Sequence, residues 1–207
     1  MDIDSTWRAI DAQRVRVADL LDGVTGGEWE TPSLCAGWTV RDVTAHLTLQ
    51  QLGLREAVAQ FRTLGGLNTV IREAARRRAA TRSPASLVAE IRGMVGSRRH
   101  NIGVTPAETL IDILVHGLDI AVPLGRDLEI PTDAAAAAAT RMWTMRWPRP
   151  IVSRRRFAGL RLTATDADWS VGSGAPVEGP MTALLLLLAG RTTTALPHLS
   201  GAAALAA

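Results

Sequence analysis

The sequence has few of several residue types: one cysteine in 207 residues, two phenylalanines, no tyrosine, and no lysine, so arginine supplies all 23 basic side chains. A single cysteine excludes an intramolecular disulfide framework and suits a reducing compartment, so we expect a cytoplasmic protein. Because arginine stays protonated to high pH, a formal net charge of only +3 gives a sequence pI of about 10.7. The high pI therefore does not by itself indicate nucleic-acid binding.

Long apolar runs are also missing. The opening MDIDSTWRAID is acidic and polar, unlike a secretory signal, and the run MTALLLLLAG from Met181 is too short to span a bilayer. The arginine tracts at 76–78 and 154–156 lack interleaved aromatic side chains, which favours solvated surfaces over a nucleic-acid groove. With 47% hydrophobic residues the chain can bury a core of ordinary size. We expect a folded protein that binds neither nucleic acid nor membrane.

Apolar residues at helical spacing predict four helices with mostly short connections. The first lies near the N-terminus and ends at GVTGG. The second begins after Thr39 and runs to about Arg62; the third begins after Ser83 and the fourth after Thr105, each with N-cap signals typical of a helix start. The tract 75–82, ARRRAATR, is interpreted as a solvated linker or a frayed helix. Together these features predict a four-helix bundle.

The pattern changes near residue 148. A fifth helix is predicted from PTDAAAAAATRMWTMRW, which begins at Pro131; then RFAGLRLTATDADWSVGSG alternates as strands do, and GPMTALLLLLAGR returns to a helix. We therefore expect a mainly α protein with a helical bundle over residues 1–148 and a small α+β subdomain over residues 149–207.

Three polar residues in the predicted bundle could hold a metal ion. Asp112 and His116 lie four apart on the fourth helix and so project from one face, while His46 follows Val43 and precedes Leu47 on the apolar face of the second. Two histidines and a carboxylate would form a divalent-metal site with an open position, for which zinc is the first expectation and nickel, iron and manganese are also suitable. The same spacing often arises by chance, so packed core histidines remain the alternative.

Several neighbouring residues have competing interpretations. Glu108 lies one turn before Asp112 and is an alternative metal ligand, although a capping box would give it a backbone partner. Asp119, three residues after His116, is placed to orient an imidazole from outside the metal shell. Cys35 could act as a nucleophile, but it has no histidine nearby in the sequence, so we expect it to pack as a small apolar side chain.

Three stretches, PSLCAGWTVRDVTAHL, LIDILVHGLDIAVPLGR and FAGLRLTATDADWSVGSGAPVEGPMTALLLLLAGR, together resemble the mycothiol-dependent maleylpyruvate isomerase family, whose N-terminal part is a DinB-like four-helix bundle. The resemblance covers nearly the whole chain in consistent order. It implies an enzyme of actinobacterial type that binds a divalent metal and uses mycothiol as co-substrate. The family's metal ligands fall here on His46, Asp112 and His116, although glutamate or histidine is common where Asp112 stands.

The activity implied by the resemblance is attack of a metal-activated thiol on a small electrophile, in an isomerisation or an S-transfer. Arg191, in the terminal AGR of the third stretch, matches a family position suited to a substrate carboxylate. The expected partners are a small-molecule thiol and a small electrophilic substrate, and the protein is expected to be a monomer or a homodimer. The alternative is a non-catalytic metal- or ligand-binding bundle with a regulatory role, which would need no thiol pocket.

Overall fold

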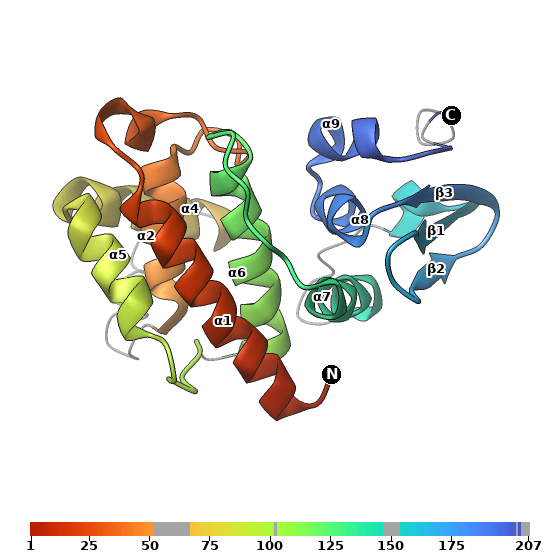
Figure 1. The fold of residues 1–207 in the computed structure, drawn as a ribbon, viewed down its shortest axis with the longest axis horizontal. Helices are drawn as coiled ribbons and strands as arrows, with labels where there is room; N and C mark the ends of the chain where they lie inside the picture. Colours follow the sequence, from red (N-terminus) through yellow and green to blue (C-terminus); the bar gives the residue numbers. More distant parts are fainter. Residues whose placement is uncertain (52–66, 102, 147–153, 202, 204–207) are drawn as a thin grey trace. The chain divides into compact units, whose positions relative to one another are not determined.

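The computed structural model describes residues 1–51, 67–101, 103–146, 154–201 and 203. The chain divides into two compact units: residues 2–129, here called the helical unit, and residues 130–207 with Met1, here called the C-terminal unit (Figure 1). The described chain is mainly helical with a small sheet in the C-terminal unit, which confirms the predicted fold class. None of its described helices combines the length and the apolar character needed to cross a membrane.

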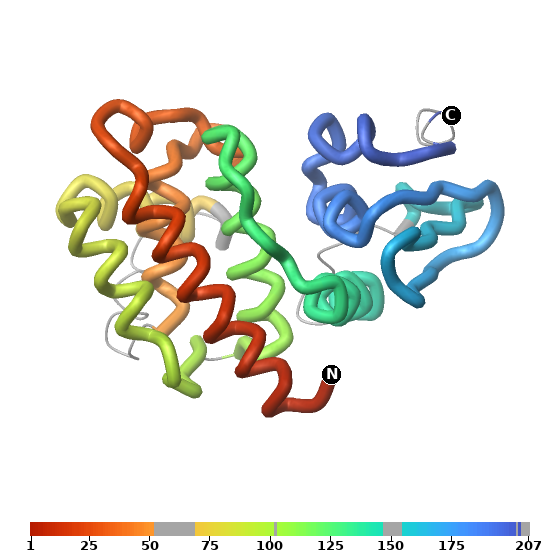
Figure 2. Tube along the Cα trace, in the orientation of Figure 1, coloured from red at the N-terminus to blue at the C-terminus, as the bar shows by residue number. Residues whose placement is uncertain are grey.

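The helical unit is a bundle with an interior of aliphatic side chains. Helix α1 packs against α5 and α6, and α2 packs against α4 and α6; Figure 2 traces these helices without side chains. Ile10, Leu47 and Leu114, from three different helices, are fully or almost fully removed from solvent. The bounds are α1 Ile3–Asp22, α2 Val40–Leu47, α4 Leu67–Thr81, α5 Pro84–Gly93 and α6 Pro106–Ala121.

The predicted N-caps are present in the structure. Thr39 and Thr105 each form a capping box with the acidic residue three positions later, and the Ser83 side chain accepts a hydrogen bond from Ser86 N. These caps satisfy amide groups that the first helical turn leaves without partners, so they fix where α2, α5 and α6 begin. The starts of the two helices that carry the candidate metal ligands are therefore encoded locally.

Two expectations for the helical unit need correction. The α-helical part of α2 ends at Leu47 and passes into a 3-10 helix, η2, over Thr48–Gln51; the rest of the predicted extension lies outside the described residues. The tract 75–82, expected to be a linker or a frayed helix, instead forms the end of α4 except for its last residue. Ala75 and Ala79 are buried because small side chains let α4 approach α2 closely.

The described part of the C-terminal unit combines a three-stranded sheet with three α-helices. Its strands have the order β2-β1-β3, with β1 antiparallel to β2 and parallel to β3. Helix α8, which carries the apolar run, is almost completely buried and packs against α7 and β1. The division between the units precedes α7, whereas the sequence places this helix with the bundle. The bounds are α7 Thr132–Thr144, β1 Leu160–Ala164, β2 Ser170–Gly172, β3 Ala175–Gly179, α8 Met181–Leu188 and α9 Thr192–Ala195.

Candidate metal centre

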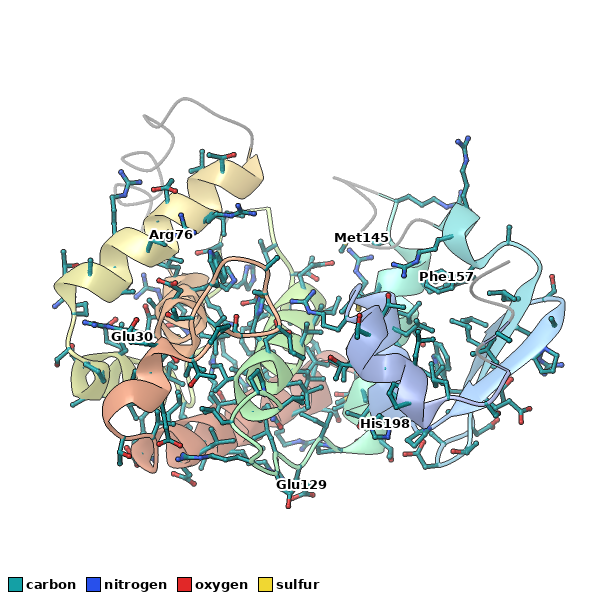
Figure 3. All side chains as sticks on the ribbon, turned by 90° about the horizontal axis from the view of Figure 1, so that it is seen from above. Glu30, Arg76, Glu129, Met145, Phe157 and His198 are labelled. Atoms are coloured by element: carbon teal, nitrogen blue, oxygen red, sulfur yellow. The ribbon has the colours of Figure 1, made fainter. Side chains whose placement is uncertain are left out.

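The candidate centre lies within the helical unit, where α2, η2 and the loop before α2 meet α6. His46 is in the last turn of α2, and Asp112 and His116 lie one turn apart on α6. Arg76 of α4, which is labelled in Figure 3, also contacts the loop: its Nη2 donates a hydrogen bond to Gly37 O at 2.8 Å. Helix starts and loop contacts therefore both position the site.

The imidazoles of His46 and His116 both approach one oxygen of the Asp112 carboxylate. Asp112 Oδ1 lies 3.1 Å from His46 Nε2 and 3.4 Å from His116 Nε2, and one ligand atom from each of the three residues lies within 4.8 Å of the others. The two imidazole rings are 4.7 Å apart, edge to face. The side chains are 15%, 28% and 16% exposed in that order, so the cluster is enclosed but accessible from solvent.

These spacings fit a divalent cation. Two ligand atoms, each about 2.0–2.2 Å from one ion, lie about 2.8–3.6 Å apart in octahedral or tetrahedral geometry, and both distances to Asp112 Oδ1 fall in that range. Two imidazole nitrogens and one carboxylate oxygen are ligands that zinc and other first-row divalent metals accept. The three residues that the sequence singles out thus stand where they could share one ion.

The electrostatics of the cluster couple the Asp112 carboxylate to the two imidazoles. Burial alone would raise the pKa of Asp112, but the charge of His46 and hydrogen bonds from both imidazoles hold this pKa well below its usual range. Burial alone would lower the pKa of His116, but hydrogen bonds with Asp112, Asp119 and Cys35 raise it well above its usual value. In the absence of a metal, the site therefore favours a proton on His116 beside the Asp112 carboxylate, and a bound ion would have to displace that proton.

Asp119 and Cys35 lie on the other side of His116. The fully buried Asp119 accepts hydrogen bonds at Oδ2 from His116 Nδ1 at 2.8 Å and from Cys35 Sγ at 3.1 Å. Asp119 is thus placed to orient the imidazole, and this role remains a prediction. The expectation that Cys35 packs as a small apolar side chain is wrong, because the residue is only partly buried and its Sγ donates to the Asp119 carboxylate. Leu34 N also donates to Asp119 O at 3.2 Å, which joins the cysteine's loop to α6. Cys35, His116 and Asp119 form a second group with metal-binding potential.

The sequence analysis missed two further residues at the centre. Gln50 in η2 donates from Nε2 to Asp112 Oδ2 at 2.8 Å. The ring of Trp38 lies 5.2 Å from the His46 ring and 6.3 Å from the His116 ring, and the residue is only 8% exposed. Gln50 follows His46 by four residues, a spacing that could have indicated a shared face; no comparable local signal links Trp38 to α6.

The two remaining candidates have other surroundings. The Glu108 carboxylate accepts hydrogen bonds from Thr105 N, at 2.7 Å, and from Thr105 Oγ1, as the capping box requires. Within the described residues, Glu108 belongs to neither group with metal-binding potential. Arg191 lies in the C-terminal unit, immediately before α9, where its Nη1 donates to Ala189 O. Its role toward substrate remains a prediction.

The class of protein follows from a match between residues 10–112 and a family model described as the mycothiol maleylpyruvate isomerase N-terminal domain. The matched segment contains His46 and Asp112 and ends four residues before His116. The chain belongs to this family through its helical unit.

Two solved structures share the fold over most of the chain. One is the crystal structure of the mycothiol-dependent maleylpyruvate isomerase, with 15% sequence identity and a TM-score of 0.62; it covers 93% of this chain and 91% of that one. The other is a histidine-to-alanine mutant of the mycothiol-dependent maleylpyruvate isomerase, with 16% identity, a TM-score of 0.61, and coverage of 94% and 91%. No curated protein matches the sequence.

Proposed function

We propose that this chain is a divalent-metal-dependent enzyme that uses mycothiol to act on a small electrophile. The thiolate would either add reversibly to an activated double bond, so that the substrate isomerises, or displace a leaving group in an S-transfer. The family match and the activity named for the two similar structures support the thiol co-substrate. The observation that carries the metal dependence is the convergence of His46 and His116 on Asp112 Oδ1.

His46, Asp112 and His116 would hold the ion, with zinc as the first candidate. A divalent ion bound there would lower the pKa of a coordinated thiol, so that thiolate is available at neutral pH. Three protein ligands leave a coordination position for an incoming group, which distinguishes a catalytic site from a closed structural one. The partial exposure of all three side chains supports access of a small molecule to this position.

The surrounding residues would orient the ligands. Asp119 accepts the hydrogen bond at His116 Nδ1, so Nδ1 would keep its proton, and the lone pair of Nε2 could face an ion once the Nε2 proton has been displaced. The buried Trp38 lies beside the two imidazoles and would limit access of bulk water from that side. For a substrate that bears a carboxylate, Arg191 is the proposed partner, because a guanidinium binds a carboxylate through two parallel hydrogen bonds.

Metal analysis followed by thiol titration tests the proposal. The purified protein should contain close to one divalent ion per chain, and His116→Ala should lose it. After cobalt substitution, mycothiol should change the visible d–d spectrum, as expected when sulfur enters the coordination sphere. Bound metal without a spectral response to thiol would instead support the non-catalytic metal-binding bundle, and absence of metal binding would refute the proposed function.

A further inference from the structure

We infer that Gln50 is a positioning residue for the metal site: it holds one oxygen of Asp112 and leaves the other for the ion, while the buried Arg14 fixes the orientation of the Gln50 amide. The inference rests on the proposed function, because it assigns to Gln50 a role in metal binding. It concerns a residue outside the set of ligands implied by the family resemblance.

The contacts of Asp112 divide between its two oxygens. Oδ1 faces His46 and His116, whereas Oδ2 accepts a hydrogen bond from Gln50 Nε2 at 2.8 Å. His46 and Gln50 lie four residues apart, so the end of α2 and the 3-10 helix η2 hold the same carboxylate from consecutive turns. A carboxylate held in this way cannot rotate freely about its terminal torsion, and Oδ1 stays directed at the imidazoles.

Arg14 determines which end of the Gln50 amide faces Asp112. Its guanidinium is fully buried, and Nη2 lies 3.4 Å from Gln50 Oε1. Because arginine can only donate hydrogen bonds, the amide oxygen must face Arg14 and the amide NH₂ must face the carboxylate. Arg14 is itself fixed by Met94 O, which accepts from Nη1 at 2.8 Å, and by Asp11 Oδ1 at 3.3 Å.

Because the Asp112 side chain is short, the contact with Gln50 matters for how its carboxylate is oriented. An aspartate is one methylene shorter than a glutamate, so its carboxylate has less freedom to adjust to an ion, and its starting orientation matters more. A donor on Oδ2 favours coordination through Oδ1 alone. Outer residues that orient a metal ligand typically contribute about tenfold to hundredfold to metal affinity.

Zinc affinity of Gln50→Met, measured by competition with a chromophoric chelator, tests the inference. Methionine has a similar length and flexibility but cannot donate to Asp112. The matched control is Gln51→Met, in the same turn: Gln51 Nε2 is buried and, in the part of the chain that the structure describes, has no hydrogen-bond partner. We expect Gln50→Met to bind zinc about tenfold to hundredfold more weakly than wild type, and Gln51→Met to bind within about twofold of it.

A second measurement on the wild-type protein does not depend on how the variants fold. In NMR spectra, one side-chain amide proton of Gln50 should exchange slowly with solvent and should shift when zinc is added, whereas those of Gln51 should respond less. The visible spectrum of cobalt-substituted Gln50→Met should also differ from wild type. A role of Gln50 in the fold alone would not change the ligand field of the ion.

The possible outcomes distinguish a failure of the positioning role of Gln50 from a failure of the proposed function. If wild type binds zinc and Gln50→Met binds it equally well, the positioning role is refuted while the proposed function stands. If wild type binds no divalent ion, the proposed function fails and this inference fails with it. If Gln50→Met does not fold, the NMR measurement on wild type decides. The inference is overturned if the side-chain amide protons of Gln50 exchange as fast as those of Gln51 and do not shift when zinc is added.

Discussion

Replacing each candidate carboxylate by its amide distinguishes Asp112 from Glu108 as the metal ligand. Asp112→Asn keeps the size of the side chain but removes the charge at the point where both imidazoles converge. Glu108→Gln is the matched control, because glutamine at this position can still complete a capping box with Thr105. We expect only Asp112→Asn to lose most of the bound metal.

The expected size of the effect follows from binding linkage. A ligand present at a thousandfold its dissociation constant stabilises the folded protein by about 4.1 kcal/mol. In a chain of 207 residues, 1 kcal/mol shifts the thermal midpoint by about 2–4 °C. Zinc should therefore raise the midpoint of wild type and of Glu108→Gln by about 8–16 °C, whereas Asp112→Asn should lose most of this rise. Without metal, Glu108→Gln should stay within about 0.5 kcal/mol of wild type.

Metal content per chain and thermal midpoints with and without zinc, measured on the three proteins, provide the assay. Metal retained in Asp112→Asn but lost in Glu108→Gln would refute the assignment, because it would show that the capping carboxylate is the ligand. An unchanged zinc response in both variants would refute the whole cluster as the metal site.

Two further predictions concern the residues around His116. Cys35→Ser should keep zinc content and thiol-dependent activity, because a hydroxyl can also donate to Asp119. Cys35→Ala cannot donate and should lower the unfolding free energy by about 1 kcal/mol. A Cys35→Ser protein that folds but has no turnover would show that the sulfur takes part in the chemistry. The raised pKa of His116 should stabilise the metal-free protein fully below the unfolded pKa of about 6.5, and this contribution should disappear as pH rises through the folded value. Thermal midpoints between pH 5 and 9 check this, and a His116→Gln variant whose alkaline loss equals that of wild type would contradict it.

The helix starts could be predicted from the sequence because their causes are local. Thr39 and Thr105 each act on amides within the next turn, so short motifs contain the information. The helical structure of tract 75–82 could not be predicted from local motifs in the same way. Its arginines dominate the composition, but the burial of Ala75 and Ala79 against α2 decides the outcome, and this contact depends on the tertiary fold.

The assignment of α7 to the C-terminal unit shows the same limit. Periodicity indicates that residues from Pro131 onward form a helix, but it does not indicate which element the helix covers. The partner is α8, whose residues lie more than thirty positions later in the sequence. Element type was therefore predictable, whereas its packing partner was not.

The candidate site combines both kinds of information. Asp112, His116 and Asp119 lie on one helix, so their spacing can be read from the sequence, but further contacts of this group come from other segments. Cys35, before α2, reaches Asp119 on α6, and Gln50, after α2, reaches Asp112. The segment 35–50 thus contacts α6 near both of its ends, with His46 between them. A shift of α2 by one turn would break all of these contacts together. The loop, α2 and the 3-10 helix η2 therefore position the site as one element.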